Sequence, residues 1–254
     1  MKVKKHLPGY STRKKQQKGY TKMFVEVKDL KKDYGIGENI VHVLKGLNFQ
    51  LEKGEICTVL GPSGAGKSTL LNLIGGIDTL TSGEIRINGK KIELDDKDGL
   101  LEYRRDHLGF VFQFYNLIPD LTVKENIEVC GFLGKKSLDI QKLLKDLGLK
   151  EHQNKYPRQL SGGQQQRTSI GRALIKAPTL LLCDEPTGAL DYDTSKEILE
   201  LIENVNKEYN TTILIVTHNE AISRMSDRII HLKDGRITKN EMNPSKISAK
   251  NLAW

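Results

Sequence analysis

Residues 61–69 combine glycines, a lysine and hydroxyl groups, and residues 61–68 fit the spacing G-x-x-x-x-G-K-[ST]. Glycines let a loop curl until successive backbone N–H groups point at one anion. Lys67 can then reach the β- and γ-phosphates of a nucleotide, and the Ser68 hydroxyl can ligate Mg²⁺. The residues expected at this phosphate site are Gly61, Pro62, Ser63, Gly64, Ala65, Gly66, Lys67, Ser68 and Thr69.

Two adjacent carboxylates, Asp184 and Glu185, follow the apolar run 180–183. Successive side chains near a strand end point to different sides, so the two carboxylates can have different tasks. Asp184 is suited to holding Mg²⁺, directly or through water, and Glu185 to orienting or deprotonating an attacking water. Together with the glycine-rich loop, this pair predicts a nucleoside triphosphatase.

Alternating strands and helices are expected to position these residues. The apolar run 56–60 lies between glycines before the loop, as expected of a buried strand, and residues 70–74 predict an amphipathic helix behind it. Further strands are expected at 24–27, 42–51, 85–87, 108–112, 180–183, 213–216, 228–232 and 236–238, and helices at 122–129, 138–147, 163–175 and 198–205. This alternation predicts an α/β fold with a largely parallel central sheet, interrupted by helices at about 114–172.

A third motif narrows the class of ATPase. Ser161 and two glycines stand at the start of a helix-like run, where they form a second cradle for an anion. Residues 160–164 resemble the signature sequence of ATP-binding-cassette (ABC) ATPases. The resemblance implies that five residues cover the γ-phosphate of ATP bound to a partner subunit: Leu160, Ser161, Gly162, Gly163 and Gln164.

Other landmarks of the ABC family match in order along the chain. Gln113 resembles the Q-loop glutamine, which contacts Mg²⁺ or water and senses the membrane partner. Asp191 lies in a segment that resembles the D-loop, which communicates across the dimer. His218 resembles the switch histidine that contacts the γ-phosphate, and Tyr34 stands where an aromatic ring stacks on adenine.

The resemblance covers about residues 23–238 and implies the ABC ATPase fold. That fold has a RecA-like P-loop NTPase core with a mainly parallel sheet, an antiparallel β subdomain and an inserted helical subdomain, here at about 114–172. Two such domains sandwich two Mg-ATP head to tail, and one loop and one signature per chain require a second copy. Residues 1–22 are then a basic arm and residues 239–254 a short extension.

Residues 71–83, 109–119 and 184–188 resemble one branch of the family, the ATPases of lipoprotein-release, macrolide-export and bacitracin-type peptide-resistance systems. Their partners are FtsX-like integral membrane permeases, and a membrane-fusion or accessory protein is a further candidate partner. The branch implies export of, or resistance to, antimicrobial peptides, macrolides or similar amphiphiles. The alternative is the cell-division relative, which signals through its permease to wall hydrolases without transport. Both imply the cytoplasmic face of a bacterial cell membrane.

The apolar residues at 114–118, just past Gln113, are either core or part of a groove that receives a helix of the permease. Two soluble classes of the superfamily fit poorly. DNA-maintenance ATPases separate the two motifs by long coiled coils or zinc insertions, and Lys67 and Ser161 are only 94 residues apart here without heptads or Cys pairs. Translation-associated ABC proteins carry two cassettes in one chain, whereas this chain has one.

The net charge of +8 over 254 residues comes from the first 22, which contain eight Lys and Arg and no acid. Because the rest is formally neutral, the charge does not favour nucleic acid. The basic arm is either a solvated tail or faces anionic lipid on the membrane surface. The cysteines Cys57, Cys130 and Cys183 lie far apart, which predicts no disulfide framework and a reducing cytosol. The chain contains no run of 18 apolar residues, so the sequence predicts no membrane span.

Overall fold

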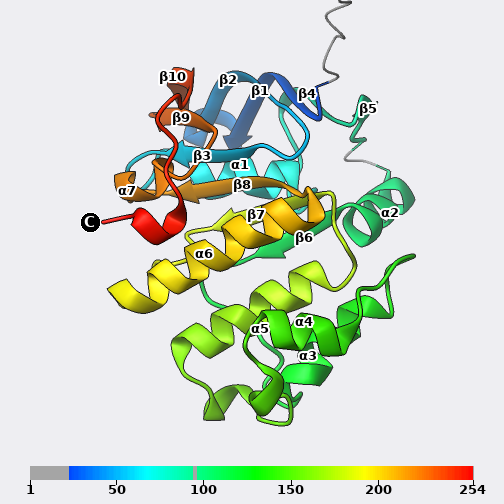
Figure 1. Ribbon diagram of the computed structural model, residues 1–254. Coiled ribbons are helices and arrows are strands. Elements are labelled where there is room, and N and C mark those ends of the chain that lie inside the picture. The colour runs from blue at the N-terminus through cyan, green and yellow to red at the C-terminus, as the bar shows by residue number, and fades with distance from the viewer. Residues whose placement is uncertain (1–22, 94–95, 254) are drawn as a thin grey trace, which may run out of the picture.

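The larger of two β-sheets carries both nucleotide motifs in the computed structural model, which describes residues 23–93 and 96–253 (Figure 1). Its strand order is β10-β9-β3-β8-β7-β6, and all neighbours run parallel except β10, which is antiparallel to β9. The strands are β3 (Ile56–Leu60), β6 (Leu108–Val111), β7 (Leu180–Asp184), β8 (Thr212–Thr217), β9 (Arg228–Lys233) and β10 (Arg236–Met242). Because parallel strands point the same way, the ends of β3, β7 and β8 lie on one edge of the sheet.

The smaller sheet is antiparallel, with the order β2-β1-β4-β5. It consists of β1 (Val25–Tyr34), β2 (Val41–Leu51), β4 (Ser82–Ile87) and β5 (Lys90–Lys91). Helix α1 (Lys67–Ile74) lies between the two sheets, where Leu70, Leu71, Leu73 and Ile74 are fully buried in one core with side chains of β1, β2 and β3. This core fixes the start of α1, and with it the loop before it.

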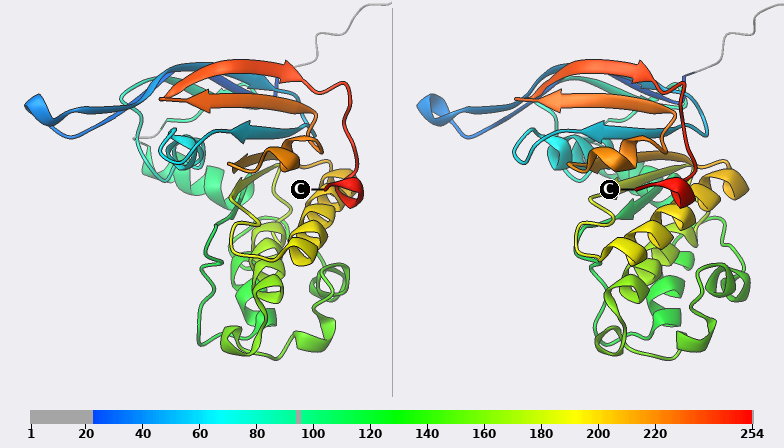
Figure 2. Two further views of the ribbon diagram at one scale, coloured as in Figure 1. Left: turned by 90° about the vertical axis from the view of Figure 1, so that its left-hand side faces the viewer. Right: turned by 60° about the vertical axis from the view of Figure 1, so that its left-hand side comes forward.

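A second core covers the other face of the larger sheet and continues into a lobe of helices (Figure 2). It joins the inner face of α6 (Tyr192–Tyr209) to α3 (Val123–Gly131), α4 (Ile140–Asp146) and α5 (Gly162–Leu174). The lobe therefore meets the sheet through α5, which lies against β6, and through α6, which packs against α5. Short 3-10 turns complete it at Lys150–His152 and Pro157–Gln159.

The α/β class and the expected strands are confirmed, and the expected helices occur at those places. Two helices were not expected. Helix α2 (Lys97–Asp106) is rich in charge and buries only Leu100 and Tyr103, so it shows no apolar stripe. Helix α7 (Glu220–Ser223) is a single turn. Strand β10 and the 3-10 turn Ala249–Asn251 extend regular structure beyond residue 238.

Two further observations bear on the sequence predictions. Among the helices of residues 23–93 and 96–253, none has the length and apolar content to cross a membrane. Cys57 and Cys183 are fully buried on β3 and β7, and burial raises the pKa of both thiols. The basic arm 1–22 and Trp254 lie outside the described residues.

Candidate functional site

The loop between β3 and α1 turns sharply because two of its glycines have positive φ, Gly64 at +79° and Gly66 at +100°. A side chain at Gly66 would also meet Leu44 Cδ2 at 2.7 Å. Helix α1 begins directly after Gly66, so the first amides of the helix lack partners within it. Such a loop followed by a helix start is suited to binding a phosphate group.

Lys67 lies at the floor of this loop, with 8% of its surface exposed. Its Nζ donates to the carbonyl oxygens of Gly61 at 2.9 Å and Pro62 at 3.1 Å. The same ammonium lies 3.7 Å from the Glu185 carboxylate. The first residue of α1 and the residue that follows β7 therefore meet, so the two sequence motifs lie together.

The Ser68 hydroxyl donates to Asp184 Oδ1 at 3.1 Å. Burial raises the pKa of Asp184, and the neighbouring Glu185 charge adds to this, whereas the Ser68 bond and Lys67 act the other way. Hydroxyl and carboxylate oxygens are ligands that Mg²⁺ prefers, and a cation would offset the cost of burying this carboxylate. Ser68 and Asp184 therefore fit an Mg²⁺ ion that also binds phosphate oxygens.

Glu185 has an unusual backbone with φ at +43°, held by its N–H bond to the Val216 carbonyl at 3.0 Å. Its Oε2 accepts from the Thr217 hydroxyl at 2.8 Å, and its Oε1 lies 2.9 Å from His218 Nδ1. Positive φ outside glycine is strained and persists where neighbours hold it. The end of β8 thus fixes the carboxylate at the end of β7.

One groove of ≈ 420 Å³ collects these side chains. Of the residues predicted from sequence, nine line it: Ser63, Gly64, Gly66, Lys67, Ser68, Thr69, Gln113, Glu185 and His218. Val43 of β2 also lines the groove, and Thr217 bonds to Glu185; sequence reasoning named neither. Thr217 directly precedes His218, so a hydroxyl at a strand end was the available signal.

Tyr34 lies at the end of β1, outside the residues that line this groove. Its hydroxyl donates to Asp78 Oδ2 at 2.5 Å, and Lys32 Nζ lies 4.5 Å from its ring centroid. Burial and the Asp78 bond raise the pKa of Tyr34, while a bond with the Thr69 hydroxyl lowers it. The ring is therefore adjacent to Thr69 at the edge of the phosphate site and is 42% exposed.

The signature segment and the predicted D-loop are held by local helix caps. Ser161 caps α5: its Oγ accepts from Gln164 N at 3.3 Å, while Gln164 Oε1 accepts from Ser161 N at 3.1 Å. Asp191 caps α6 by accepting from Thr194 N at 2.9 Å and from the Thr194 hydroxyl at 2.7 Å. No residue of 160–164, nor Asp191, is among the described residues that line the groove of the same chain.

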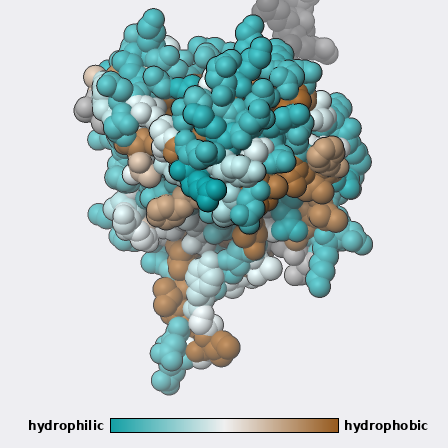
Figure 3. Space-filling model, turned by 90° about the horizontal axis from the view of Figure 1, so that it is seen from below, coloured by the Kyte–Doolittle hydropathy of each residue, from teal (hydrophilic) through white to brown (hydrophobic). Residues whose placement is uncertain are grey.

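The apolar stretch after Gln113 is largely at the surface. Phe114 is 72% exposed and Ile118 41%, and Phe132 and Leu133 at the end of α3 are 84% and 64% exposed. Seen from below, where the helical lobe lies in Figure 1, the molecule shows several apolar patches among hydrophilic side chains (Figure 3). Of the two interpretations of residues 114–118, burial in the core is wrong for Phe114 and Ile118.

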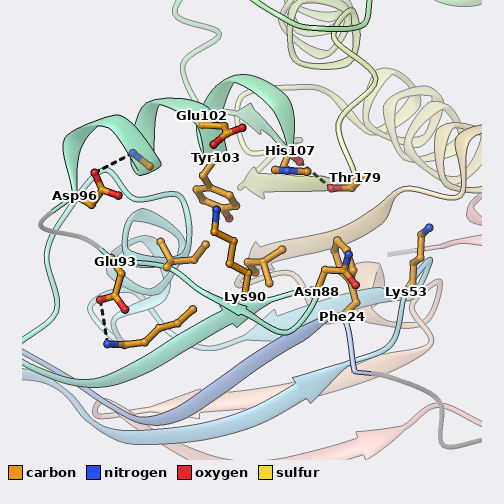
Figure 4. Close-up of a pocket in the computed structure, with 14 residues that line it drawn as sticks. Phe24, Lys53, Asn88, Lys90, Glu93, Asp96, Glu102, Tyr103, His107 and Thr179 are labelled. Atoms are coloured by element: carbon orange, nitrogen blue, oxygen red, sulfur yellow. Dashed lines mark hydrogen bonds and ion pairs between the residues drawn. The ribbon is translucent and has the colours of Figure 1, made fainter.

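A more enclosed pocket of ≈ 280 Å³ lies elsewhere, between β4, β5 and α2. Phe24, Lys90 and Tyr103 line it, and Figure 4 shows the Lys90 side chain extended toward the Tyr103 ring. The buried Tyr103 hydroxyl donates to the Ile74 carbonyl at 2.8 Å. None of the residues predicted for ATP lines this pocket, so the wider groove at the phosphate loop is the candidate active site.

Comparison with known proteins agrees with this assignment. The profile of the family described as "ABC transporter" matches residues 44–188. An uncharacterized ABC transporter ATP-binding protein of Methanocaldococcus jannaschii, MJ0796, is 43% identical over 85% of this chain and 96% of its own length. The chain belongs to the ABC transporter family and is an ATP-binding, ATP-hydrolysing cassette.

A solved structure and a longer relative add detail. The dimeric MJ0796 cassette, bound to ADP and Pi in a post-hydrolysis state, has a TM-score of 0.79 and 42% identity, covering 86% of this chain and 98% of that one. The macrolide export ATP-binding/permease protein MacB of Shigella flexneri is 41% identical over 90% of this chain. The chain spans only 36% of MacB's length. The predicted ABC ATPase fold is confirmed.

Proposed function

We propose that this chain drives an integral membrane permease, working as a homodimer that encloses two Mg-ATP. The observation that carries the proposal is the meeting of Lys67, Ser68, Glu185 and His218 in one groove, with Asp184 bonded to Ser68 behind it. The signature residues of the same chain lie outside that groove. A second copy is the natural source of the missing half, and dimeric MJ0796 structures support this arrangement.

Hydrolysis in this groove needs a held phosphate chain and a base for water. Lys67 would exchange its bonds to the Gly61 and Pro62 carbonyls for bonds to phosphate oxygens, and Ser68 and Asp184 would hold Mg²⁺. When bound, Mg²⁺ neutralises charge that develops on the phosphates. Glu185, oriented by Thr217 and His218, takes a proton from water as the water oxygen bonds to the γ-phosphorus and the bridging bond to the β-phosphate breaks.

The roles of the remaining predicted residues follow from their positions. Gln113 lies on the groove next to the exposed segment 114–118, so it is placed to couple nucleotide to a membrane partner. Tyr34 supports the adenine at the edge of the site. The capped helix start at Ser161 faces the partner's ATP, since an N-terminal helix end favours negative charge. Asp191, whose carboxylate caps α6, communicates across the dimer.

The permease is of the FtsX-like type in this proposal, on the cytoplasmic face of a bacterial cell membrane. Similarity to MacB, whose name states macrolide export, supports an export or resistance role for amphiphiles such as antimicrobial peptides or macrolides. A membrane-fusion or accessory protein is a further partner, and nucleic acid is not one. The alternative remains signalling to wall hydrolases through the permease, and the ectodomain of a copurifying permease would discriminate the two.

The decisive test of the ATPase mechanism is Glu185→Gln. We expect ATP binding to persist and the closed dimer to accumulate, while kcat falls by roughly 10²-fold or more because the base is lost. Glu241→Gln is the matched control, since Glu241 lies on β10, outside the groove, and pairs with Lys239. Phosphate release and size-exclusion chromatography with ATP report both effects, and undiminished turnover in Glu185→Gln would refute the mechanism.

The basic arm gives a separate proposal, that residues 1–22 hold the protein at anionic lipid. Vesicles with and without anionic lipid should be bound differently by the full chain at low salt, and removal of residues 1–22 should abolish the difference. Equal binding by both proteins would show that the arm does not serve this purpose.

A further inference from the structure

Residues 243–252, called the strap below, leave β10 and cross to α6, the helix that starts at the predicted D-loop. In Figures 1 and 2 this segment runs down from the sheet and ends beside α6. Its first part is bonded to residues 224–227, which connect α7 to β9. Asn243 Nδ2 donates to the Ser226 carbonyl at 3.0 Å, Lys246 pairs with Asp227 at 2.8 Å, and Ile247 N donates to the Arg224 carbonyl at 3.0 Å.

The second part of the strap is bonded to α6 itself. Glu203, whose side chain is only 6% exposed, accepts from the Ser248 hydroxyl at 2.8 Å and from Ala249 N at 3.3 Å. Ala249 and Leu252 are fully buried, at 0% and 1% exposure, in the same core as the inner face of α6. Lys207, one turn further along α6, pairs with Glu203 Oε1 at 3.0 Å, whereas both donors of the strap bind Oε2. Loss of the strap would leave that buried oxygen without these donors, which is costly, so the two bonds hold the strap in place.

The strap also reaches the first turn of α6. The Tyr192 hydroxyl donates to the Leu252 carbonyl at 3.2 Å, and Tyr192 directly follows Asp191. In that turn Thr194 bonds to Asp191 through both its N–H and its hydroxyl. The methyl group of Thr194 lies against Gly163 so closely that no side chain fits there. A continuous series of contacts therefore leads from the strap through the first turn of α6, which carries the predicted D-loop residue, to the signature segment.

We propose that Tyr192 and Glu203 are positioning residues, through which the strap sets the partner-facing surface formed by Asp191 and the signature segment. The inference rests on the proposed function, because it assigns that surface to the second copy's ATP. Within the described residues, the hydrogen bonds and the ion pair of the strap reach residues 224–227 and α6, and none reaches the phosphate loop, so the two halves of the site are positioned separately.

Tyr192→Phe tests the proposal with little risk to folding, because it removes one hydroxyl. Amide hydrogen exchange should become about fivefold faster at Thr194 and Gln164, as expected for the loss of one net hydrogen bond, and stay unchanged in residues 61–69. Tyr209→Phe, the same change at the far end of α6, is the control and should leave Thr194 and Gln164 as in the wild type. Unchanged exchange at Thr194 and Gln164 in Tyr192→Phe overturns the proposal.

A second pair of variants separates positioning from general stability. Glu203→Gln keeps an acceptor for Ser248 and Ala249, whereas Glu203→Ala removes it. We expect Glu203→Ala to lower kcat about fivefold with KM for ATP unchanged, and Glu203→Gln to restore most of the rate. The proposal is contradicted if Glu203→Ala has the same kcat as the wild type. It is also contradicted if the KM of this variant for ATP rises about fivefold. If the wild type itself lacks ATPase activity, the proposed function fails, and hydrogen exchange still decides the role of the strap.

Discussion

The two halves of the proposed ATP site differ in what holds their side chains. In the groove half, bonds join residues far apart in the chain, such as Ser68 to Asp184 and Glu185 to His218. In the partner-facing half, the bonds of Ser161 and Asp191 reach only three residues ahead. The groove is therefore a product of the whole fold. The partner-facing half is shaped by local helix caps, which the strap supports through α6, and it needs a second chain to complete a site.

The most direct test of this difference uses two variants, one with a substitution in the groove half and the other with a substitution in the partner-facing half. Lys67→Ala should weaken ATP binding, and Ser161→Arg should block the partner-facing surface, so each alone should lose roughly 10²-fold of its ATPase rate. In a mixture, each mixed dimer has one intact site and one doubly damaged site. With random mixing and independent sites, about a quarter of the wild-type rate returns.

The measurement is phosphate release from the two variants, separately and mixed after joint refolding or coexpression. A chain that carries both changes, mixed with itself, is the control and should show no recovery. A mixture no faster than the average of the separate variants would contradict sites shared between chains with independent turnover.

Gly163→Ala examines the contact between the signature segment and α6. A methyl group there meets Thr194 Cγ2, so we expect the first turn of α6 to shift, at a cost of about 1–3 kcal/mol in the free energy of unfolding, with ATP-dependent dimerisation weakened. Adding Thr194→Ser removes that methyl group but keeps the hydroxyl for Asp191, and should restore dimerisation. Denaturant unfolding and size-exclusion chromatography measure both; a double variant no better than Gly163→Ala would disprove the steric cause.

Tyr34 tests how far the groove half extends. Tyr34→Ala should weaken ATP binding by about tenfold if the ring stacks on adenine, because stacking on a base contributes roughly 1–3 kcal/mol. Tyr34→Phe keeps the ring and loses only the hydroxyl with its bonds to Asp78 and Thr69, so its ATP affinity should stay within about twofold. Titration calorimetry in the Glu185→Gln background measures both, and equal affinities for the Ala and Phe variants would remove Tyr34 from the site.

Asp184→Asn should have the smallest effect, a small change in Tm in the absence of nucleotide. It distinguishes the contribution of this carboxylate to stability from its contribution to hydrolysis. Because the pKa of Asp184 is raised in the folded protein, its ionised form costs stability, and this cost appears as pH rises above the unfolded pKa. Without nucleotide or Mg²⁺, Asp184→Asn should therefore raise Tm at pH 7 by on the order of 2 °C. It should also reduce Mg²⁺-dependent hydrolysis. A lower Tm of Asp184→Asn in calorimetry would show that the ionised carboxylate stabilises the folded protein, which contradicts the prediction.

The sequence by itself determined the parts of the site that depend on short spacing. Glycines at 64 and 66 suit the positive φ of the loop, and the runs of β3 and β7, apolar except for Thr58 and the final Asp184, have the length and composition of buried strands. Because their strands run parallel, the two motifs had to end at the same edge of the sheet. The caps at Ser161 and Asp191 also depend on short spacing, because each side chain binds a residue three positions ahead. A hydroxyl or carboxylate directly before a helix predicts such a cap.

Only the tertiary structure decided which distant groups meet. Thr217 holds Glu185 because β7 and β8 are neighbours in the sheet, and Val43 reaches the groove because β2 packs over α1. The strap bonds to Glu203, 45 residues away from Ser248, after an antiparallel turn into β10 that spacing alone does not reveal. Contacts of that kind depend on the path of the whole backbone, whereas short motifs carry their geometry in neighbouring residues.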